Sequence, residues 1–189
     1  MTVKRRADFA ENRLRILEAA NEIFVEDGVG APLDSIAKRA GIGRATFFRH
    51  FPDRRALINE MLDMFLADLE VKAKEIPVEG EGLFDLVRHF FDEMIANAPI
   101  ADYLRAQSRE DPALLDAVER FNTLLGPHVK HAIDEKLVGP ELRTNDIVIL
   151  AVMLAAAATT PNIGPEGRRR AYDVVFQGLR QTDRARTPA

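Results

Sequence analysis

Residues 33–51 hold the side chains whose types and spacing could do chemistry. The segment reads Leu-Asp-Ser-Ile-Ala-Lys-Arg-Ala-Gly-Ile-Gly-Arg-Ala-Thr-Phe-Phe-Arg-His-Phe. Its second half predicts a short helix that presents guanidinium, hydroxyl and imidazole groups outward. Such groups donate hydrogen bonds to phosphates and to base edges in a DNA groove. The residues predicted to face outward are Arg44, Ala45, Thr46, Phe48, Arg49 and His50.

A preceding helix and a turn must hold this short helix in place. Gly41 can adopt the left-handed backbone of a tight turn, and the small Ala37 lets the two helices cross closely. The residues predicted to pack the pair are Ile36, Ala37, Ala40, Ile42, Phe47 and Phe51. A helical hairpin buried inside a bundle, with no nucleic-acid partner, is the alternative interpretation of the same pattern.

Helical periodicity covers nearly the whole chain, and no strand or hairpin pattern is evident. The prediction is an all-α fold of about nine helices. Asp53 is a plausible N-cap of the fourth helix, and Gly126-Pro127 is a predicted kink in the seventh. The expected ranges are 11–26, 32–40, 44–51, 54–76, 83–97, 100–109, 112–137, 145–160 and 166–181.

Composition narrows the function classes. Residues 1–55 hold 11 Lys and Arg against 8 Asp and Glu, whereas the remaining residues hold 15 against 22. A basic segment that could approach phosphates therefore precedes an acidic one.

There is no cysteine, which excludes disulfides and thiolate zinc sites. No signal-like stretch opens the chain, and the longest apolar run, 147–158, is shorter than the roughly 20 residues of a membrane span. A cytoplasmic protein with no membrane association is expected.

The N-terminal segment resembles the TetR family of transcriptional regulators. The resemblance runs from Leu-Arg-Ile-Leu-Glu-Ala-Ala-Asn-Glu-Ile-Phe at 14–24, through Gly28, to His-Phe-Pro-Asp-Arg-Arg-Ala-Leu at 50–57. Specific matches cover about the first 60 residues. The resemblance implies a three-helix helix-turn-helix DNA-binding domain over 1–53 and a helical ligand-binding and dimerisation domain over 54–182. A disordered tail is expected over 183–189.

The family pattern also implies roles for individual residues. Thr46 falls where the family contacts DNA from the middle of the recognition helix, and Arg44 where a basic side chain reaches a base or phosphate. His50 and Arg54 fall at positions where the family contacts the phosphate backbone of DNA.

Three residues depart from the family pattern. Phe48 replaces a tyrosine and so loses a phosphate hydrogen bond. Ala45 replaces a glycine, adding a methyl that could touch a thymine. Gly43 replaces a serine cap at a small energetic cost. None of these departures is expected to break the fold.

A ligand cavity among the later helices is also implied by the resemblance. Plain core packing is the alternative interpretation for every candidate lining residue. The candidates are Met64, Phe65, Phe84, Phe90, Phe91, Met94, Tyr103, Phe121 and Met153.

The resemblance implies that the last two helices pair with those of a second copy into a four-helix bundle. A homodimer is also what paired readers of palindromic half-sites require. The predicted interface comprises Ile147, Leu150, Ala151, Leu154, Ala158, Ala171, Val174, Val175 and Gly178.

The resemblance implies a repressor that a small-molecule effector releases from operator DNA. No convergent acid, base or nucleophile indicates an enzyme, and no cofactor is implied. The competing hypothesis is a helical small-molecule-binding or interaction module that has lost specific DNA binding. The effector, the operator and the sign of regulation stay open.

Other polar groups receive plainer interpretations. His128 and His131 are spaced to share a metal ion but lack an acid in register, so they and His89 are interpreted as ordinary histidines. The basic run at 4–6 is expected to precede the first helix as a solvated arm that could reach a minor groove. The run at 168–170 is interpreted as a solvated face.

Overall fold

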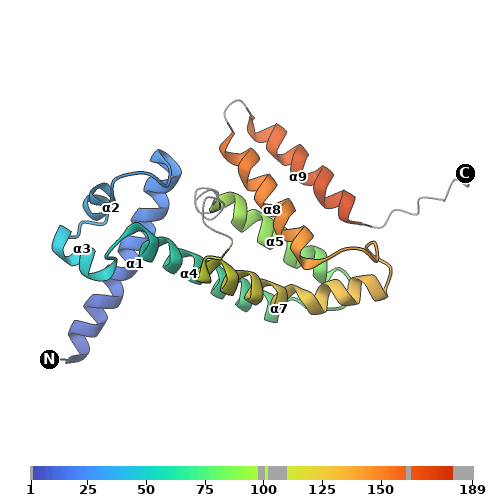
Figure 1. Ribbon diagram of the computed structural model, residues 1–189, viewed down its shortest axis with the longest axis horizontal. Helices are drawn as coiled ribbons and strands as arrows, with labels where there is room; N and C mark the ends of the chain where they lie inside the picture. The colour runs from blue at the N-terminus through green and yellow to red at the C-terminus, as the bar shows by residue number, and fades with distance from the viewer. Residues whose placement is uncertain (1, 98–100, 102–109, 161–162, 181–189) are drawn as a thin grey trace, which may run out of the picture. The chain divides into compact units, whose positions relative to one another are not determined.

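The computed structural model describes residues 2–97, 101, 110–160 and 163–180. Within these ranges the fold is all-helical (Figure 1), and it contains eight helices. The all-α prediction is confirmed. The sixth predicted helix, over 100–109, falls almost entirely outside the described residues, and Tyr103 and the tail 183–189 also lie outside them. The helices are α1 (Thr2–Asp27), α2 (Leu33–Arg39), α3 (Arg44–His50), α4 (Arg54–Glu75), α5 (Gly82–Ala96), α7 (Pro112–Asp134), α8 (Thr144–Thr159) and α9 (Pro165–Leu179).

The chain forms two compact units. The first takes the described residues of Met1–Phe65 and Asn97–Leu115, and the second takes those of Leu66–Ala96 and Asp116–Ala189. Helix α4 contributes residues to both units. The predicted boundary between residues 53 and 54 stays a prediction.

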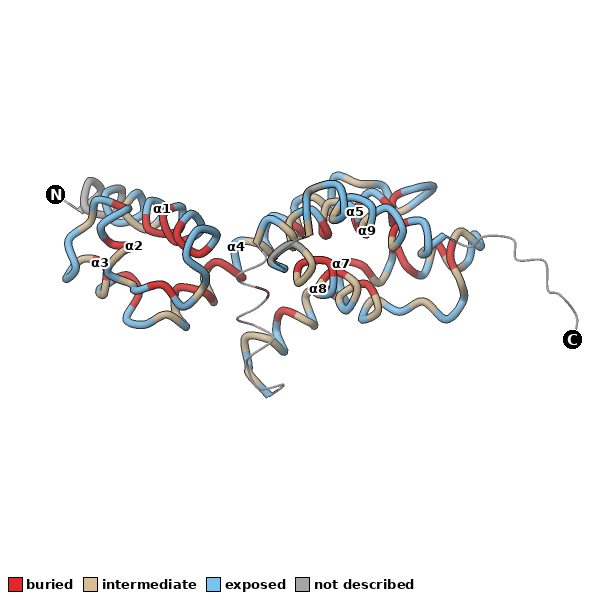
Figure 2. Tube along the Cα trace, turned by 90° about the horizontal axis from the view of Figure 1, so that it is seen from above, coloured by how far each residue is buried: buried red, intermediate tan, exposed pale blue. Residues whose placement is uncertain are grey.

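The core of the first unit lies among α1, α2, α3 and the start of α4. Ile16, Ala20 and Phe24 recur along one side of α1, so a helix of period 3.6 buries them together. Ile36, Phe47 and Leu57 are fully buried against them. Figure 2 shows these buried stretches in red on the facing sides of the helices.

Helix α1 begins earlier than the sequence suggested. It starts at Thr2 rather than near Glu11, so the prediction that the basic run 4–6 precedes the first helix is wrong. A tertiary contact accounts for the extension, because Phe9 lies against the His50 ring with ring centroids 4.0 Å apart. Such an aromatic contact stabilises the first helical turns of α1, whose sequence is mostly polar and does not by itself indicate a helix.

The second unit is built around α5. Its apolar residues recur at i, i+3, i+4 and i+7, so Leu83, Leu86, Val87 and Phe90 lie on one buried face. Helix α8 packs on α5, and α9 packs on α8. Helix α7 continues through Pro127 from Pro112 to Asp134, and Phe121 and Leu125 are buried on it. Of the helices that the structure describes, none is long and apolar enough to cross a membrane.

Candidate nucleic-acid interface

The turn between α2 and α3 fixes the direction of α3. Gly41 adopts φ +64° and donates its N–H to the carbonyl of Lys38 at 3.1 Å. Ile42 donates to the carbonyl of Ala37 at 3.0 Å. This bond pair is a Schellman motif, which places a left-handed residue directly after the helix. The predicted role of Gly41 as the residue that ends α2 is therefore confirmed.

The inner side of α3 anchors it to the core. Phe47 and Phe51 are buried, and Ile42 is partly buried beside them, as the sequence predicted. Phe48 is half-buried and meets Phe47 edge to face, with ring centroids 5.3 Å apart. Helix α3 is only seven residues long, so these contacts rather than helix propensity hold it in shape.

The outer side of α3 carries the predicted reading face. Arg44, Ala45 and Arg49 are exposed, and Thr46 and Phe48 are half-buried. Gly43 is the N-cap of α3 and supplies no side-chain cap bond. The exposed guanidinium groups, the threonine hydroxyl and the alanine methyl can address phosphates, base edges and a thymine methyl respectively.

Arg44 is held by an acid from α2. Its Nη1 lies 2.7 Å from Asp34 Oδ2, and both side chains are more than half exposed. The Arg44 guanidinium also lies 5.5 Å from the centre of the Phe48 ring. No local pattern indicates this pairing, since ten residues and a turn separate the two partners. The contact joins the exposed Arg44 side chain of α3 to α2.

His50 does not point outward, so that part of the prediction is wrong. Only 7% of His50 is exposed, because the Phe9 ring covers it. Neither ring nitrogen has a hydrogen-bond partner. Burial, followed by the positive charges of Arg49 and Arg13, lowers the pKa of His50 below its ordinary value. Burial thus disfavours the charged form of the imidazole, and the DNA contact predicted for His50 stays a prediction.

Arg54 binds the loop between α1 and α2. Its guanidinium donates to the carbonyl of Val29, to that of Ala31 at 2.5 Å and, more weakly, to that of Gly30 at 3.4 Å. A planar fork of donors suits such clustered acceptors. Asp53 caps the same helix by accepting the Ala56 N–H at 2.8 Å, as predicted. Both terminal nitrogens of the Arg54 guanidinium thus donate to loop carbonyls, and the phosphate contact predicted for Arg54 stays a prediction.

The predicted ligand-lining residues do not form one group. Phe84, Phe90, Phe91 and Phe121 are buried, and Phe90 and Phe121 are in contact with ring centroids 4.4 Å apart. Phe65 and Met94 are half-buried. Met64 and Met153 are 45% and 62% exposed. The buried phenylalanines pack the core of the second unit, which is the plainer of the two interpretations weighed for them.

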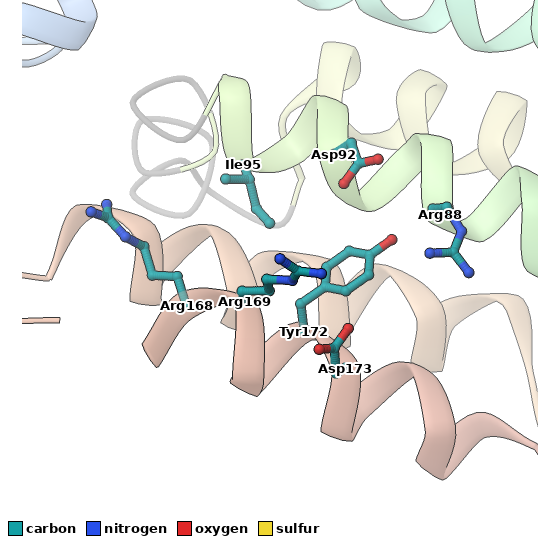
Figure 3. Close-up of a pocket in the computed structure, with 7 residues that line it drawn as sticks. All are labelled: Arg88, Asp92, Ile95, Arg168, Arg169, Tyr172 and Asp173. Carbon is teal, nitrogen blue, oxygen red and sulfur yellow. The ribbon is translucent and has the colours of Figure 1, made fainter. Parts of the chain in front are cut away.

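A pocket of about 500 Å³ lies elsewhere in the second unit, between α5 and α9 (Figure 3). Figure 3 shows the Tyr172 ring between these helices with its hydroxyl directed toward α5. That hydroxyl is buried and has no hydrogen-bond partner. Burial and the charge of Asp92 raise the pKa of Tyr172 to about 12. The lining residues are Arg88, Asp92, Ile95, Arg168, Arg169, Tyr172 and Asp173.

Of the residues that line this pocket, the sequence pattern singles out only Arg168 and Arg169, which are interpreted there as part of a solvated face. The aromatic pair Tyr172 and Phe176, four residues apart on α9, was the available signal. The two rings stack with an interplanar angle of 5°, and Arg88 lies 4.4 Å over the Phe176 ring.

The face of α8 predicted to meet a second copy is buried within the chain. Ile147, Ala151 and Leu154 are at most 6% exposed, because α8 packs this face on its own chain. The prediction is wrong for these three residues, and Leu150 is half-buried. Among the described side chains of α8, the large apolar ones that are exposed are Ile149 and Met153. The side chain of Ala158 lies outside the described residues.

The α9 residues of the same prediction remain accessible. Val174 is 61% exposed, Gly178 is exposed, and Ala171 and Val175 are half-buried. An apolar face on α9 therefore remains available to a partner.

His128 and His131 lie on α7 in different environments. His128 is buried with neither ring nitrogen bonded, and His131 is half-buried. Neither belongs to a group of metal-ligating side chains among the residues described.

The turn geometry, the anchored inner side and the basic outer side of α3 define a helix-turn-helix protein. Residues 16–61 match the model of the family described as bacterial regulatory proteins, tetR family. The helix-turn-helix of this chain is therefore similar to this family over these residues.

Known proteins similar to this chain agree with that assignment. An uncharacterized HTH-type transcriptional regulator of Mycobacterium tuberculosis strain H37Rv is 36% identical over 99 residues, which are 52% of this chain and 47% of that protein. An HTH-type transcriptional regulator of Staphylococcus aureus strain USA300 is 32% identical over 125 residues, 64% of this chain and 60% of that protein. The matched region thus spans about half the length of these curated relatives.

The resemblance in structure extends further along the chain. A TetR transcriptional regulator from Streptomyces coelicolor has a TM-score of 0.62 and 29% identity, covering 90% of this chain and 99% of that one. The TetR transcription regulatory protein from Mycobacterium vanbaalenii has a TM-score of 0.63 and 29% identity, covering 93% and 99%. The second unit therefore shares its fold with such proteins as well.

Proposed function

We propose that the chain is a cytoplasmic, non-enzymatic transcription regulator that binds operator DNA as a homodimer through α3. The observation that carries this proposal is the outer face of α3, where Arg44, Thr46 and Arg49 stand on a helix whose direction Gly41 fixes. A short, rigidly held helix of this composition suits a major groove. The similarity over residues 16–61 supports the same proposal.

We further propose that the chain represses transcription and that a small-molecule effector releases it from the operator. Such release requires that the effector bind the DNA-incompetent state more tightly than the DNA-bound state. Helix α4 contributes residues to both units, so a ligand that shifts α4 can alter the presentation of α3. The pocket between α5 and α9 is the candidate effector site among the described residues. Its three arginines and two aspartates favour a polar ligand that carries negative charge.

The homodimer is assigned to the exposed apolar residues of the last two helices. Ile149 and Met153 lie four residues apart on α8, so they share one face, and Val174 is exposed on α9. The proposed interface therefore uses these exposed residues, and not the face of α8 that was predicted from the sequence and is buried. A two-fold pairing places two α3 helices on two half-sites.

A second candidate function is a ligand-binding module without specific DNA binding. The pairing of Arg44 with Asp34 and the carbonyl partners of Arg54 favour it, because both leave fewer donors for phosphates. Phe48 adds to this, since it lacks a hydroxyl.

A binding selection separates the two candidates. The purified chain is incubated with a pool of random duplexes, and bound sequences are enriched and measured by fluorescence anisotropy at several salt concentrations. The regulator predicts a palindromic sequence whose binding is lost in the Arg44→Ala, Thr46→Ala double variant. Arg170→Ala, which removes an exposed positive charge on α9, is the control and should bind normally. Failure of any sequence to be enriched would favour the module.

A further inference from the structure

Three side chains with metal-ligating atoms converge in the second unit, on α4 and α5. They are Asp68, His89 and Glu93, and one ligand atom from each lies within 4.8 Å of the other two. In the sequence His89 is a lone histidine, because Asp68 is 21 residues away along the chain. Among the residues that the structure describes, no other group of this kind occurs.

The geometry of the group comes from two helices. His89 and Glu93 are four residues apart on α5, so they lie one turn apart on the same side. Asp68 approaches from α4, and its Oδ2 lies 3.1 Å from His89 Nε2. The His89 side chain is 24% exposed, whereas that of Asp68 is 62% exposed. The imidazole is thus partly enclosed, and the open side admits water or an ion.

We propose that Asp68, His89 and Glu93 bind a divalent transition-metal ion such as Zn²⁺ or Co²⁺. Around a tetrahedral zinc ion the ligand atoms are about 3.3 Å apart, given the usual bond lengths. Asp68 Oδ2 and His89 Nε2 already have nearly this separation. Two carboxylates neutralise a dication, and the imidazole favours zinc or cobalt over magnesium and calcium, which prefer all-oxygen ligands.

A bound ion would connect α4 to α5. The existing Asp68–His89 contact joins the same helices with one weak, exposed interaction, whereas three coordinate bonds would hold both helices firmly. The site requires neither DNA binding nor the pocket between α5 and α9, so it stands independently of the proposed function.

Metal titration of the full chain, purified without a histidine tag and treated with a chelator, tests the site. Isothermal titration calorimetry with Zn²⁺ should give one ion per chain. Co²⁺ should give visible absorption bands of a low-symmetry site containing nitrogen and oxygen ligands. His89→Ala should abolish these bands and weaken Zn²⁺ binding at least tenfold, and the isosteric Glu93→Gln and Asp68→Asn should each weaken it about tenfold.

Controls make the result decisive. His131→Ala removes a half-buried histidine of α7 and should leave binding unchanged, while circular dichroism checks that each variant keeps its helices. Absence of stoichiometric Zn²⁺ binding by the wild-type chain would overturn the proposal. So would equal binding by wild type, His89→Ala and Glu93→Gln. Displacement of Co²⁺ by an equal concentration of Mg²⁺ would contradict the assigned class of ion.

Discussion

Arg44 at the start of α3 and Asp34 in the first turn of α2 form an ion pair of 2.7 Å on the proposed reading face. In the proposed DNA complex, the acid would neutralise a cation that faces phosphate. It also favours the N-terminus of α2 through the helix dipole.

Asp34→Asn is therefore expected to strengthen DNA binding. Removing one negative charge from the reading face should raise affinity for a selected duplex by about threefold to tenfold at low salt, with the gain shrinking as salt screens it. Stability should change by less than about 1 kcal/mol, since the pair is exposed. Fluorescence anisotropy over a salt series measures the first effect, and Asp27→Asn, at the end of α1, is the control. Unchanged affinity in Asp34→Asn would separate this ion pair from DNA binding.

Arg54→Met is expected to destabilise the first unit. The substitution removes hydrogen bonds to three loop carbonyls while keeping an apolar stem, and the loss should be about 2 kcal/mol, the range for bonds to charged donors. Urea unfolding followed by circular dichroism measures it. Arg55→Met, which removes the adjacent arginine and its single ion pair with Asp111, is the comparison and should cost less, because the Arg55 side chain is more than half exposed. If Arg54→Met keeps full stability but loses DNA affinity, the residue acts on phosphate rather than on the loop.

The burial of His50 predicts a pH dependence of stability. Because the pKa of His50 is lowered in the folded state, the unfolded chain binds the proton more readily below the ordinary value of 6.5. The stability contributed by neutral His50 should be fully present above that pH and be lost as the pH falls below it. Thermal unfolding between pH 8 and pH 5 measures this in wild type and in His50→Gln. An equally steep fall in both proteins would assign the effect to other groups.

Tyr172→Phe is expected to leave the second unit as stable or more stable. The hydroxyl is buried without a partner, so its removal should gain up to about 1 kcal/mol. The raised pKa of Tyr172, about 12, also predicts that stability falls as the pH rises above the ordinary value of 10, because the unfolded phenol ionises first. Ultraviolet titration should show a late phenolate transition that is absent from the variant. A clear loss of stability in Tyr172→Phe would mean that the hydroxyl has a partner in solution.

Val174→Glu is expected to break the proposed homodimer without unfolding the chain. Val174 is 61% exposed on α9, so a carboxylate there costs little in a single chain but would be desolvated in an interface. Light scattering after size exclusion should show the mass of one chain instead of two. Val71→Glu is the matched control, since Val71 is 56% exposed on α4. A dimer that persists in Val174→Glu would place the interface elsewhere.

Local signals were sufficient for the helix-turn-helix. Gly41, with Ala37 and Ile42 around it, predicted the turn because a Schellman motif depends only on neighbours in sequence. The helices of the second unit followed from periodicity for the same reason, as α5 illustrates. Contacts between distant residues were beyond this reasoning, and the covering of His50 by Phe9 depends on two helices packing together.

The face of α8 was ambiguous for a different reason. The helix is apolar on all sides, so periodicity does not tell whether Ile147 or Ile149 points into the core. Packing on α5 resolves the choice in favour of Ile147. In the same way, Asp68 and His89 carry no shared sequence signal, because only the approach of α4 to α5 brings them together.

The exposed apolar side chains of α8 and α9 have a further consequence for how the protein responds to its own abundance. If Ile149, Met153 and Val174 are covered only in the proposed pair of chains, mass action couples folding to protein concentration. The melting temperature would then rise with protein concentration. A cell that makes few copies would hold a larger share of single chains, which are more readily degraded. Synthesis rate would thereby set a threshold below which operator occupancy falls faster than copy number.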